Sequence, residues 1–373
     1  MNVYEKLREL LDKHPTGCPP APEIIEILKI LFSPEEAKVA LGLGFRPFPL
    51  KAIARRAGVK PEETKKRLES LSEKGMVFYK DKEGERQYAL VPIMPGVFEF
   101  PFMRGDKSPT LDKLAPLWRQ YMETMCKEFG SPSMPFSRII PIGEEVASEH
   151  GTLPYEKVYE MIDRAKVVGV AHCACRRTMQ KCDAPTEACM LFDDTCTFLV
   201  EKGYGRYLTK DEMKEMLKKY DELGLVRQVN NAQDKLTFIC NCCTCCCGLL
   251  RAMTHYGNPN VLSNSGFVPK LSAKACTGCG ICAEKRCPMK ALKLKKDRPV
   301  LDAKRCIGCG LCVTGCPEGA FKMVRSKRAK EVAPTNRDLA MKILEEKGKL
   351  QDFLPYLDPD VEPGKKREVK SEK

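Results

Sequence analysis

Hydrophobic residues in the first hundred positions recur with the period of amphipathic helices, and short polar breaks separate the recurring segments. Residues 1–32 predict two helical pieces, which the Pro- and Gly-containing stretch 14–20 interrupts. A third helix is expected to begin at Ser33-Pro34-Glu35-Glu36, where an N-cap serine precedes proline and two glutamates. The chain is therefore expected to begin with short, well-capped helices.

Two more helices and a hairpin follow in the pattern. The helices are expected over residues 49–57 and 60–75, each ending at a glycine. Residues 76–79 and 87–91 predict two strands joined by a polar turn. Helices followed by such a hairpin resemble a winged-helix domain, here over roughly residues 30–95.

A winged helix suggests DNA binding through its third helix. Residues 1–100 carry 17 basic and 15 acidic groups, however, whereas DNA-binding domains usually show a clear basic stripe. Because winged helices also serve as protein-docking modules, nucleic acid is the less favoured partner.

The next segment and the end of the chain show weaker patterns. Residues 92–165 are rich in Pro, Met and aromatic residues and predict one helix, from Pro109 to Phe129, which carries the only tryptophan, Trp118. From Pro355 onward the chain is rich in Pro, Lys and Glu, and residues 327–373 are expected to form a tail that is flexible or wraps a partner.

Cysteines give the chain its chemistry, since 21 of its 373 residues are Cys. In the middle of the chain two apolar segments, 167–171 and 236–239, predict buried strands, and each runs directly into cysteines. If these strands are neighbours, their cysteines meet in space. Ten cysteines of this region are candidate ligands: Cys173, Cys175, Cys182, Cys189, Cys240, Cys242, Cys243, Cys245, Cys246 and Cys247.

Adjacent cysteines on a strand point in opposite directions, so the six cysteines of the 240–247 run cannot all bind one cluster. Were this run helical, Cys242, Cys245 and Cys246 would share one face. The ten thiols could hold one or two further [4Fe–4S] clusters, with zinc and uncoordinated or disulfide-bonded thiols as alternatives. Arg176 and Arg177 would offset a cluster's negative charge, or form a plain surface pair. His172 is a weaker candidate ligand.

Two further cysteine runs lie near the C-terminus, and each ends in Cys-Pro. Their spacing, three close cysteines and a fourth further on, supplies three thiolates to one iron–sulfur cube and a fourth to the other. The first predicted [4Fe–4S] site is Cys276, Cys279, Cys282 and Cys316. The second is Cys306, Cys309, Cys312 and Cys287.

Zinc on Cys-x-x-Cys pairs is the main alternative for these runs, but it leaves the third cysteine, the fourth and the proline of each run unexplained. Residues 265–326 resemble a bacterial-type two-cluster ferredoxin, a pseudo-twofold fold of paired hairpins and short helices. One departure is that four residues, rather than three, precede Cys287, which lengthens a loop without removing a ligand.

The net charge of +13 is concentrated in this last module, because residues 263–326 carry 13 basic and 4 acidic groups. A basic face around a redox centre favours an acidic redox protein or an oxidoreductase subunit as partner. The alternative is that the charges only solvate the domain and offset the clusters. Seven cations lie between or beside the runs: Lys290, Lys293, Lys295, Lys296, Arg298, Lys304 and Arg305.

The sequence predicts no signal peptide and no membrane span, because no run of about 18 apolar residues occurs. Clustered cysteines in a reducing compartment favour metal ligation over disulfides. A cytoplasmic protein of an anaerobe is expected.

The whole chain resembles a group of poorly characterised iron–sulfur binding proteins of anaerobes, on the segments Cys173-Ala174-Cys175-Arg176 and Ile239 to Cys247. The expected fold class is α+β multidomain. The expected division is a helical lead and winged-helix-like domain (1–100), a helical linker region (101–165), a Cys-rich α/β module (166–262), a ferredoxin-like domain (263–326) and the tail (327–373).

We predict an electron-transfer protein, a component of an oxidoreductase system. The alternatives are an oxidoreductase with an open-site cluster or dithiol in the 240–247 region, and a redox-responsive winged-helix DNA-binding regulator.

Overall fold

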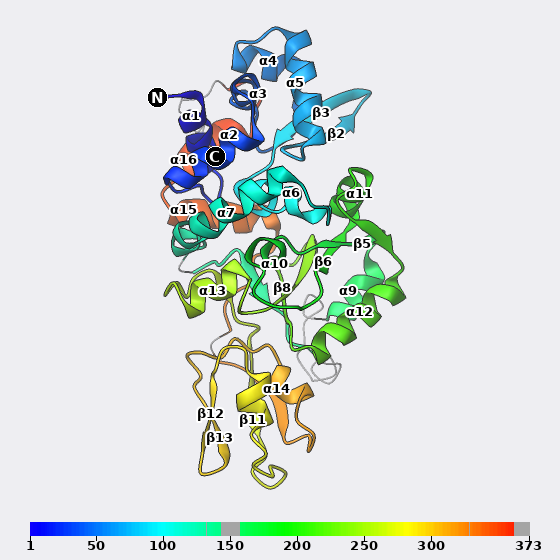
Figure 1. Ribbon diagram of the computed structural model, residues 1–373, viewed down its shortest axis with the longest axis vertical. Helices are drawn as coiled ribbons and strands as arrows, with labels where there is room; N and C mark the ends of the chain where they lie inside the picture. Colours follow the sequence, from blue (N-terminus) through cyan, green and yellow to red (C-terminus); the bar gives the residue numbers. More distant parts are fainter. Residues whose placement is uncertain (132, 143–156, 328, 362–373) are drawn as a thin grey trace, which may run out of the picture. The chain divides into compact units, whose positions relative to one another are not determined.

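The structure, a computed structural model, describes residues 1–131, 133–142, 157–327 and 329–361. The chain forms two compact units (Figure 1). Unit 1 comprises Met1–Phe129, Arg177–Met179 and Ala340–Lys373, and unit 2 comprises Gly130–Arg176 and Gln180–Leu339. Among the described helices, none is both long and apolar enough to cross a membrane.

Unit 1 begins with helices whose bounds follow the predicted breaks and caps. Ser33 accepts a hydrogen bond from the Glu36 amide, and Glu36 accepts one from the Ser33 amide, so the predicted helix start is confirmed. The helices are α1 (Val3–Asp12), α2 (Pro22–Leu31), α3 (Pro34–Ala40), α4 (Leu50–Ala57), α5 (Pro61–Glu73), α6 (Phe100–Met103) and α7 (Pro109–Glu128).

A three-stranded antiparallel sheet completes the N-terminal part of unit 1. The expected hairpin is β2 (Val77–Lys82) paired with β3 (Glu85–Leu90), and β1 (Phe48–Pro49) pairs with the other edge of β3. The sequence pattern missed β1, because two residues are too short for a detectable alternation. The predicted helix with Trp118 is confirmed as α7, where Trp118 is fully buried.

Residues beyond 327 differ from the expected flexible or partner-wrapping tail. Their described part forms α15 (Asn336–Glu346), α16 (Leu350–Phe353) and the single turn η4 (Leu354–Tyr356). Within unit 1, the Phe353 ring stacks on Phe45 at 5.7 Å between centroids, and Lys349 Nζ lies 2.7 Å from Asp12 Oδ2. Sparse but well-spaced apolar residues, such as Ile343 and Leu344, provide the buried face that orders this segment.

Unit 2 is built on a seven-stranded mixed sheet in the order β10-β4-β8-β9-β6-β5-β7. All neighbours are antiparallel except β10 and β4, which are parallel. The strands are β4 (Ser137–Ile139), β5 (Val168–His172), β6 (Glu187–Phe192), β7 (Arg206–Leu208), β8 (Val226–Asn230), β9 (Phe238–Cys242) and β10 (Leu262–Ser263).

Helices cover both faces of this sheet. α9 (Val158–Arg164) and α12 (Lys210–Glu222) share a buried core with Val168, Val170 and Ile239. The intervening Gly169 faces the opposite side, where a Cβ atom would lie 2.8 Å from Cys196 Sγ of α11 (Asp193–Glu201). Two short helices, α10 (Ala174–Met179) and α13 (Gly248–Thr254), follow β5 and β9.

The two cysteine-delivering strands are β5 and β9, but they are not neighbours. β6 lies between them and pairs with both, with Cys189 opposite Ala171 on one side and opposite Cys240 on the other. A cysteine of the intervening strand nevertheless meets one of β9, because Cys189 of β6 lies opposite Cys240.

The last part of unit 2 contains two two-stranded antiparallel sheets related in sequence. The outer pair, β11 (Phe267–Leu271) and β14 (Phe321–Arg325), brackets the segment, and β12 (Leu292–Lys295) and β13 (Arg298–Leu301) form a hairpin inside it. Two short helical turns, η3 (Cys282–Arg286) and α14 (Leu311–Thr314), each begin within one residue of a cysteine of the predicted sites.

Candidate metal centres

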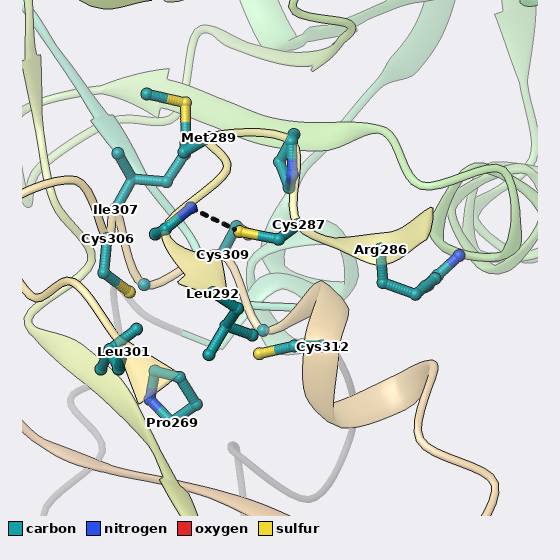
Figure 2. A pocket seen from close by; sticks show the side chains of 14 residues that line it. Pro269, Arg286, Cys287, Met289, Leu292, Leu301, Cys306, Ile307, Cys309 and Cys312 are labelled. Carbon is teal, nitrogen blue, oxygen red and sulfur yellow. Dashed lines mark hydrogen bonds between the residues drawn. The ribbon is translucent and has the colours of Figure 1, made fainter. Parts of the chain in front are cut away.

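Four cysteines from both runs line one cavity near the middle of the ferredoxin-like segment. Cys306, Cys309 and Cys312 come from the second run, and Cys287 comes from the end of the first. Figure 2 shows these side chains around the cavity together with the apolar residues Leu292 and Leu301. The four residues predicted for the second site therefore converge.

A second cavity is lined by Cys276, Cys279 and Cys282 of the first run and by Cys316 of the second. Pro299 of β13 and Phe321 of β14 provide apolar walls. The four residues predicted for the first site also converge, and in both cavities the fourth cysteine comes from the other run.

Backbone amides point at sulfur in a pattern that repeats between the two halves. The Ala291 amide donates to Cys287 Sγ at 3.1 Å, and the Ala320 amide donates to Cys316 Sγ at 3.3 Å. Each donor lies four residues after its cysteine. Amide–sulfur hydrogen bonds of this kind stabilise negative charge on cluster sulfurs and raise the reduction potential.

The two cavities differ in their exposure. Cys279 is exposed in the cavity lined by Cys276, Cys282 and Cys316, whereas burial raises the pKa of Cys309 to about 12 in the other cavity. The pKa of Cys312 is also raised, chiefly by burial. Buried thiols of this kind ionise readily only when a cation replaces their protons. We call the cavity lined by Cys276, Cys279, Cys282 and Cys316 the outer site, and the cavity lined by Cys287, Cys306, Cys309 and Cys312 the inner site.

The inner site packs directly on the seven-stranded sheet of the same unit. The Ile142 amide, three residues after β4, donates to the Cys309 carbonyl at 2.9 Å. Gly310 has a left-handed φ of 80°, and a Cβ atom there would lie 2.9 Å from the Ile142 carbonyl oxygen. Only glycine fits this contact without strain.

The ten middle cysteines separate into two groups. The first, which we call the four-thiol set, is Cys182, Cys243, Cys245 and Cys246. All four sulfurs lie within 4.8 Å of one another. Cys182 precedes β6 in a loop, and the other three lie between β9 and α13.

The second group, which we call the six-thiol set, is Cys173, Cys175, Cys189, Cys240, Cys242 and Cys247. Its members form a series of hydrogen-bonding contacts, from Cys173 to Cys175 to Cys247 to Cys242 to Cys240 to Cys189. Hydrogen bonds from Cys189 and Cys242 hold the pKa of Cys240 below its usual range. All six residues are buried or half-buried.

Three members of the six-thiol set, Cys189, Cys240 and Cys242, lie on the sheet face opposite the α9–α12 core, whereas Cys173, which follows β5, packs against that core. Ile239 of β9 and Met190 of β6 point into that core, so the adjacent Cys240 and Cys189 point away from it. Gln228 of β8 pairs with Cys240 and donates to Cys247 Sγ at 3.6 Å. The β4–β8–β9 pairing thus connects the inner site to this set.

Arg176 is a buried cation beside the middle cysteines. Its guanidinium donates to the Pro185 carbonyl at 2.6 Å and to the Asn241 carbonyl. Burial alone would lower the pKa of Arg176, but the nearby sulfurs of Cys173, Cys243 and Cys242 raise it. Arg177, in unit 1, instead donates to the backbone carbonyls of Gly105 and Asp106.

Some cysteines join neither group. Cys196, on α11, and Cys126, on α7, are fully buried, as expected for core residues. Cys18 was not singled out by the sequence pattern, and it is buried next to Tyr121, whose hydroxyl lies 3.6 Å from its sulfur.

His172 Nδ1 lies 2.9 Å from Thr186 Oγ1, and His172 is not part of the four-thiol set.

Gln228 and Ile142 are the site residues that sequence reasoning missed. Gln228 reaches Cys247 from β8, which pairs with β9, and Ile142 reaches Cys309 from the segment after β4. No local sequence motif marks either residue. The condition under which Cys242, Cys245 and Cys246 would share a helical face is not met, because β9 ends at Cys242 and a turn follows.

The donor sets of the outer and inner sites fit [4Fe–4S] clusters, since each offers four thiol sulfurs around an apolar-walled cavity. Comparison with known proteins agrees on this segment. The family model of the 4Fe-4S dicluster domain matches residues 275–320. The comparisons found no match among curated proteins or among solved structures. The chain therefore contains an iron–sulfur dicluster domain with a general role in electron transfer.

Proposed function

We propose that this protein passes single electrons between a carrier and a partner redox enzyme through a series of iron–sulfur clusters. The observation that carries the proposal is the difference between the two cavities. The outer site has an exposed cysteine, and the inner site packs on the sheet that carries the six-thiol set. Electrons would enter at the exposed outer site and leave from the inner site toward the six-thiol set.

The proposed ligands are the two interleaved quartets. Cys276, Cys279, Cys282 and Cys316 would hold the outer cluster, and Cys287, Cys306, Cys309 and Cys312 the inner one. A bound [4Fe–4S] cluster accepts and releases one electron at a time. The chain's own residues position the thiolates, donate amide hydrogen bonds to Cys287 and Cys316, and line the inner site with apolar side chains such as Leu292 and Leu301.

A basic hairpin beside the outer site is the proposed docking face. Gly278 and Gly280, between the outer cysteines, approach Asp297 and Leu294 of the β12–β13 hairpin. In the described part of the chain, the exposed amines of Lys293, Lys295 and Lys296 make no ion pair. An acidic carrier would bring the complementary charge.

We propose that the six-thiol set binds a further [4Fe–4S] cluster, which receives electrons from the inner site. Support comes from the continuous strand pairing from β4 through β8 to β9, and from Gln228, which contacts Cys247. Arg176 offsets negative charge near Cys173. Four of the six thiols suffice for one cube.

The N-terminal elements are proposed to form a winged-helix-like domain that docks protein rather than DNA. The arginines on α5 and on the β2–β3 hairpin are paired with carboxylates: Arg67 with Glu63 at 2.5 Å, and Arg86 with Asp81 at 2.9 Å. Paired cations contribute little to binding phosphates. This pairing favours a protein partner.

The test is electron transfer from a photoreduced acidic flavodoxin to the anaerobically purified protein, followed by stopped-flow absorbance near 400 nm. The triple variant K293E/K295E/K296E should react at least about tenfold more slowly at low salt, and the difference should shrink as salt is added. The matched control K65E/K66E/K80E carries the same charge change on unit 1 and should react like the natural protein. Equal rates for all three proteins would contradict the docking face.

A second candidate function is the reduction of a small substrate at the six-thiol set, because six thiols exceed the four that one cube needs. A cluster with an open iron site would bind cyanide. A changed electron paramagnetic resonance spectrum of the middle cluster on adding cyanide would favour this function, and an unchanged spectrum would favour electron transfer alone.

A further inference from the structure

The four-thiol set has a geometry of its own. The Cys182 and Cys243 sulfurs lie 3.6 Å apart, and the Cys182 and Cys246 sulfurs lie 3.8 Å apart. With Cys245, all four sulfurs fall within 4.8 Å of one another. Sulfurs this close surround a very small volume.

That volume matches a single ion and is too small for a cube. A tetrahedral zinc ion with Zn–S bonds of about 2.3 Å places its ligand sulfurs about 3.8 Å apart. A [4Fe–4S] cube has iron at four corners and pushes its ligand sulfurs to about 6 Å apart. The separations of 3.6 and 3.8 Å agree with the ion.

The same chain supplies an internal comparison. Among the described residues, which include all eight cysteines of the outer and inner sites, the four-thiol set is the only group of Cys, His, Asp or Glu whose ligand atoms lie this close together. The quartets of the dicluster domain are therefore more widely spaced than the four-thiol set.

The surroundings of the four-thiol set also suit a closed metal site. The Ala184 amide donates to Cys182 and the Lys181 amide donates to Cys246, as the second shell of a thiolate metal site requires. Four protein ligands leave no open position, which is typical of structural zinc. Within the described residues, no His, Asp or Glu joins the set.

We propose that Cys182, Cys243, Cys245 and Cys246 bind one zinc ion, which fixes the loop before β6 to the turn after β9. On binding, each Zn–S bond replaces an S–H bond, and the released protons pass to solvent, so no electron is transferred. The ion shares the 240–247 run with the six-thiol set, because Cys240, Cys242 and Cys247 belong to that set. Its role is to hold these three cysteines in position.

The inference is tested on the full chain, purified anaerobically, by measuring zinc and iron together and by X-ray absorption at the zinc edge. We expect one zinc per chain with four sulfur neighbours at about 2.3 Å. The variant C243S/C246S should lose that zinc and keep the iron of the dicluster domain. The control C276S should lose about four iron atoms and keep the zinc.

Two results would overturn the inference: a natural protein without zinc, or a C243S/C246S variant that retains its zinc. If the double variant fails to fold, the X-ray absorption of the natural protein decides alone, through the number and distance of sulfur neighbours. Zinc is measured independently of electron transfer, so failure of the proposed function leaves this test intact.

Discussion

At the scale of single residues, neighbouring cysteines have different partners. Cys242 contacts Cys240 and Cys247, whereas Cys243, the next residue, lies 3.6 Å from Cys182. The backbone explains the division, because β9 ends at Cys242 and the chain then turns. The six cysteines in eight positions therefore divide between two sites: Cys240, Cys242 and Cys247 belong to the six-thiol set, and Cys243, Cys245 and Cys246 to the four-thiol set.

Arg176 leads to a prediction about reduction potential. Replacing Arg176 with methionine removes a buried positive charge beside Cys173, so the reduced, more negative cluster proposed for the six-thiol set loses stabilisation. A unit charge several ångströms away, in an effective dielectric of about 20, is worth about 2 kcal/mol, or roughly 100 mV for one electron. Redox titration followed by electron paramagnetic resonance should show a potential lowered by that order.

Arg177 provides the matched control for this experiment. Its guanidinium donates to the carbonyls of Gly105 and Asp106, so R177M should leave the potential of the middle cluster unchanged. Equal shifts in R176M and R177M would contradict the assignment of Arg176 as the charge that acts on the six-thiol set.

At the scale of elements, the interleaved quartets predict which variants behave alike. C316S should abolish the same spectroscopic signal as C276S, although these residues belong to different runs, because both line the outer site. C287S should likewise match C306S through the inner site. Each variant should retain about four fewer iron atoms than the natural protein.

The measurement is the iron content and the electron paramagnetic resonance spectrum of all four single variants and of the two cross-run pairs. C276S/C316S should lose no more iron than either single variant. If C287S instead matched C276S, each run would serve its own cluster, and the interleaved arrangement would be wrong.

The sequence predicted the outer and inner sites but not the architecture of the middle module. The spacing of the cysteines within 276–316 is nearly enough to predict the outer and inner sites, because short loops bring these cysteines together. The middle sites depend on which strands pair: β6 separates β5 from β9, and Cys189 meets Cys240 only through that non-local pairing. No periodicity along a single segment encodes strand order. The cap of α3 was predictable because it is local, and a capping box of the same kind, made by Thr209 and Glu212, begins α12.

At the scale of the whole molecule, unit 1 joins distant parts of the chain around His14. The His14 ring lies 5.0 Å from the Phe45 ring and 6.3 Å from the Phe353 ring, between centroids. Lys347 Nζ donates to the Pro15 carbonyl at 3.0 Å. Burial, with a smaller contribution from Lys347, lowers the pKa of His14 to about 3.

This shift predicts that unit 1 loses stability in acid. Unfolded His14 takes up a proton near pH 6.5, whereas the folded residue does so only near pH 3. Stability is therefore complete above pH 6.5 and falls as the pH decreases from 6.5 to 3, by up to about 1 kcal/mol per pH unit. Urea unfolding followed by the fluorescence of Trp118, which is buried in unit 1, measures the effect.

The variant H14Q should be less stable at neutral pH and should show a shallower loss of stability below pH 6.5. H255Q, which changes an exposed histidine of unit 2, should keep the natural slope. A slope unchanged in H14Q would show that other groups cause the acid sensitivity.

The composition of unit 1 also has a consequence for how the protein is made. Residues 340–361 complete this unit by packing near Asp12 and Phe45, yet they leave the ribosome after all of residues 130–339. Every cysteine of the outer, inner and middle sites is thus translated before the first unit can close. If metals are inserted during synthesis, they would bind a nascent chain in which residues 1–129 have not yet packed against residues 340–361.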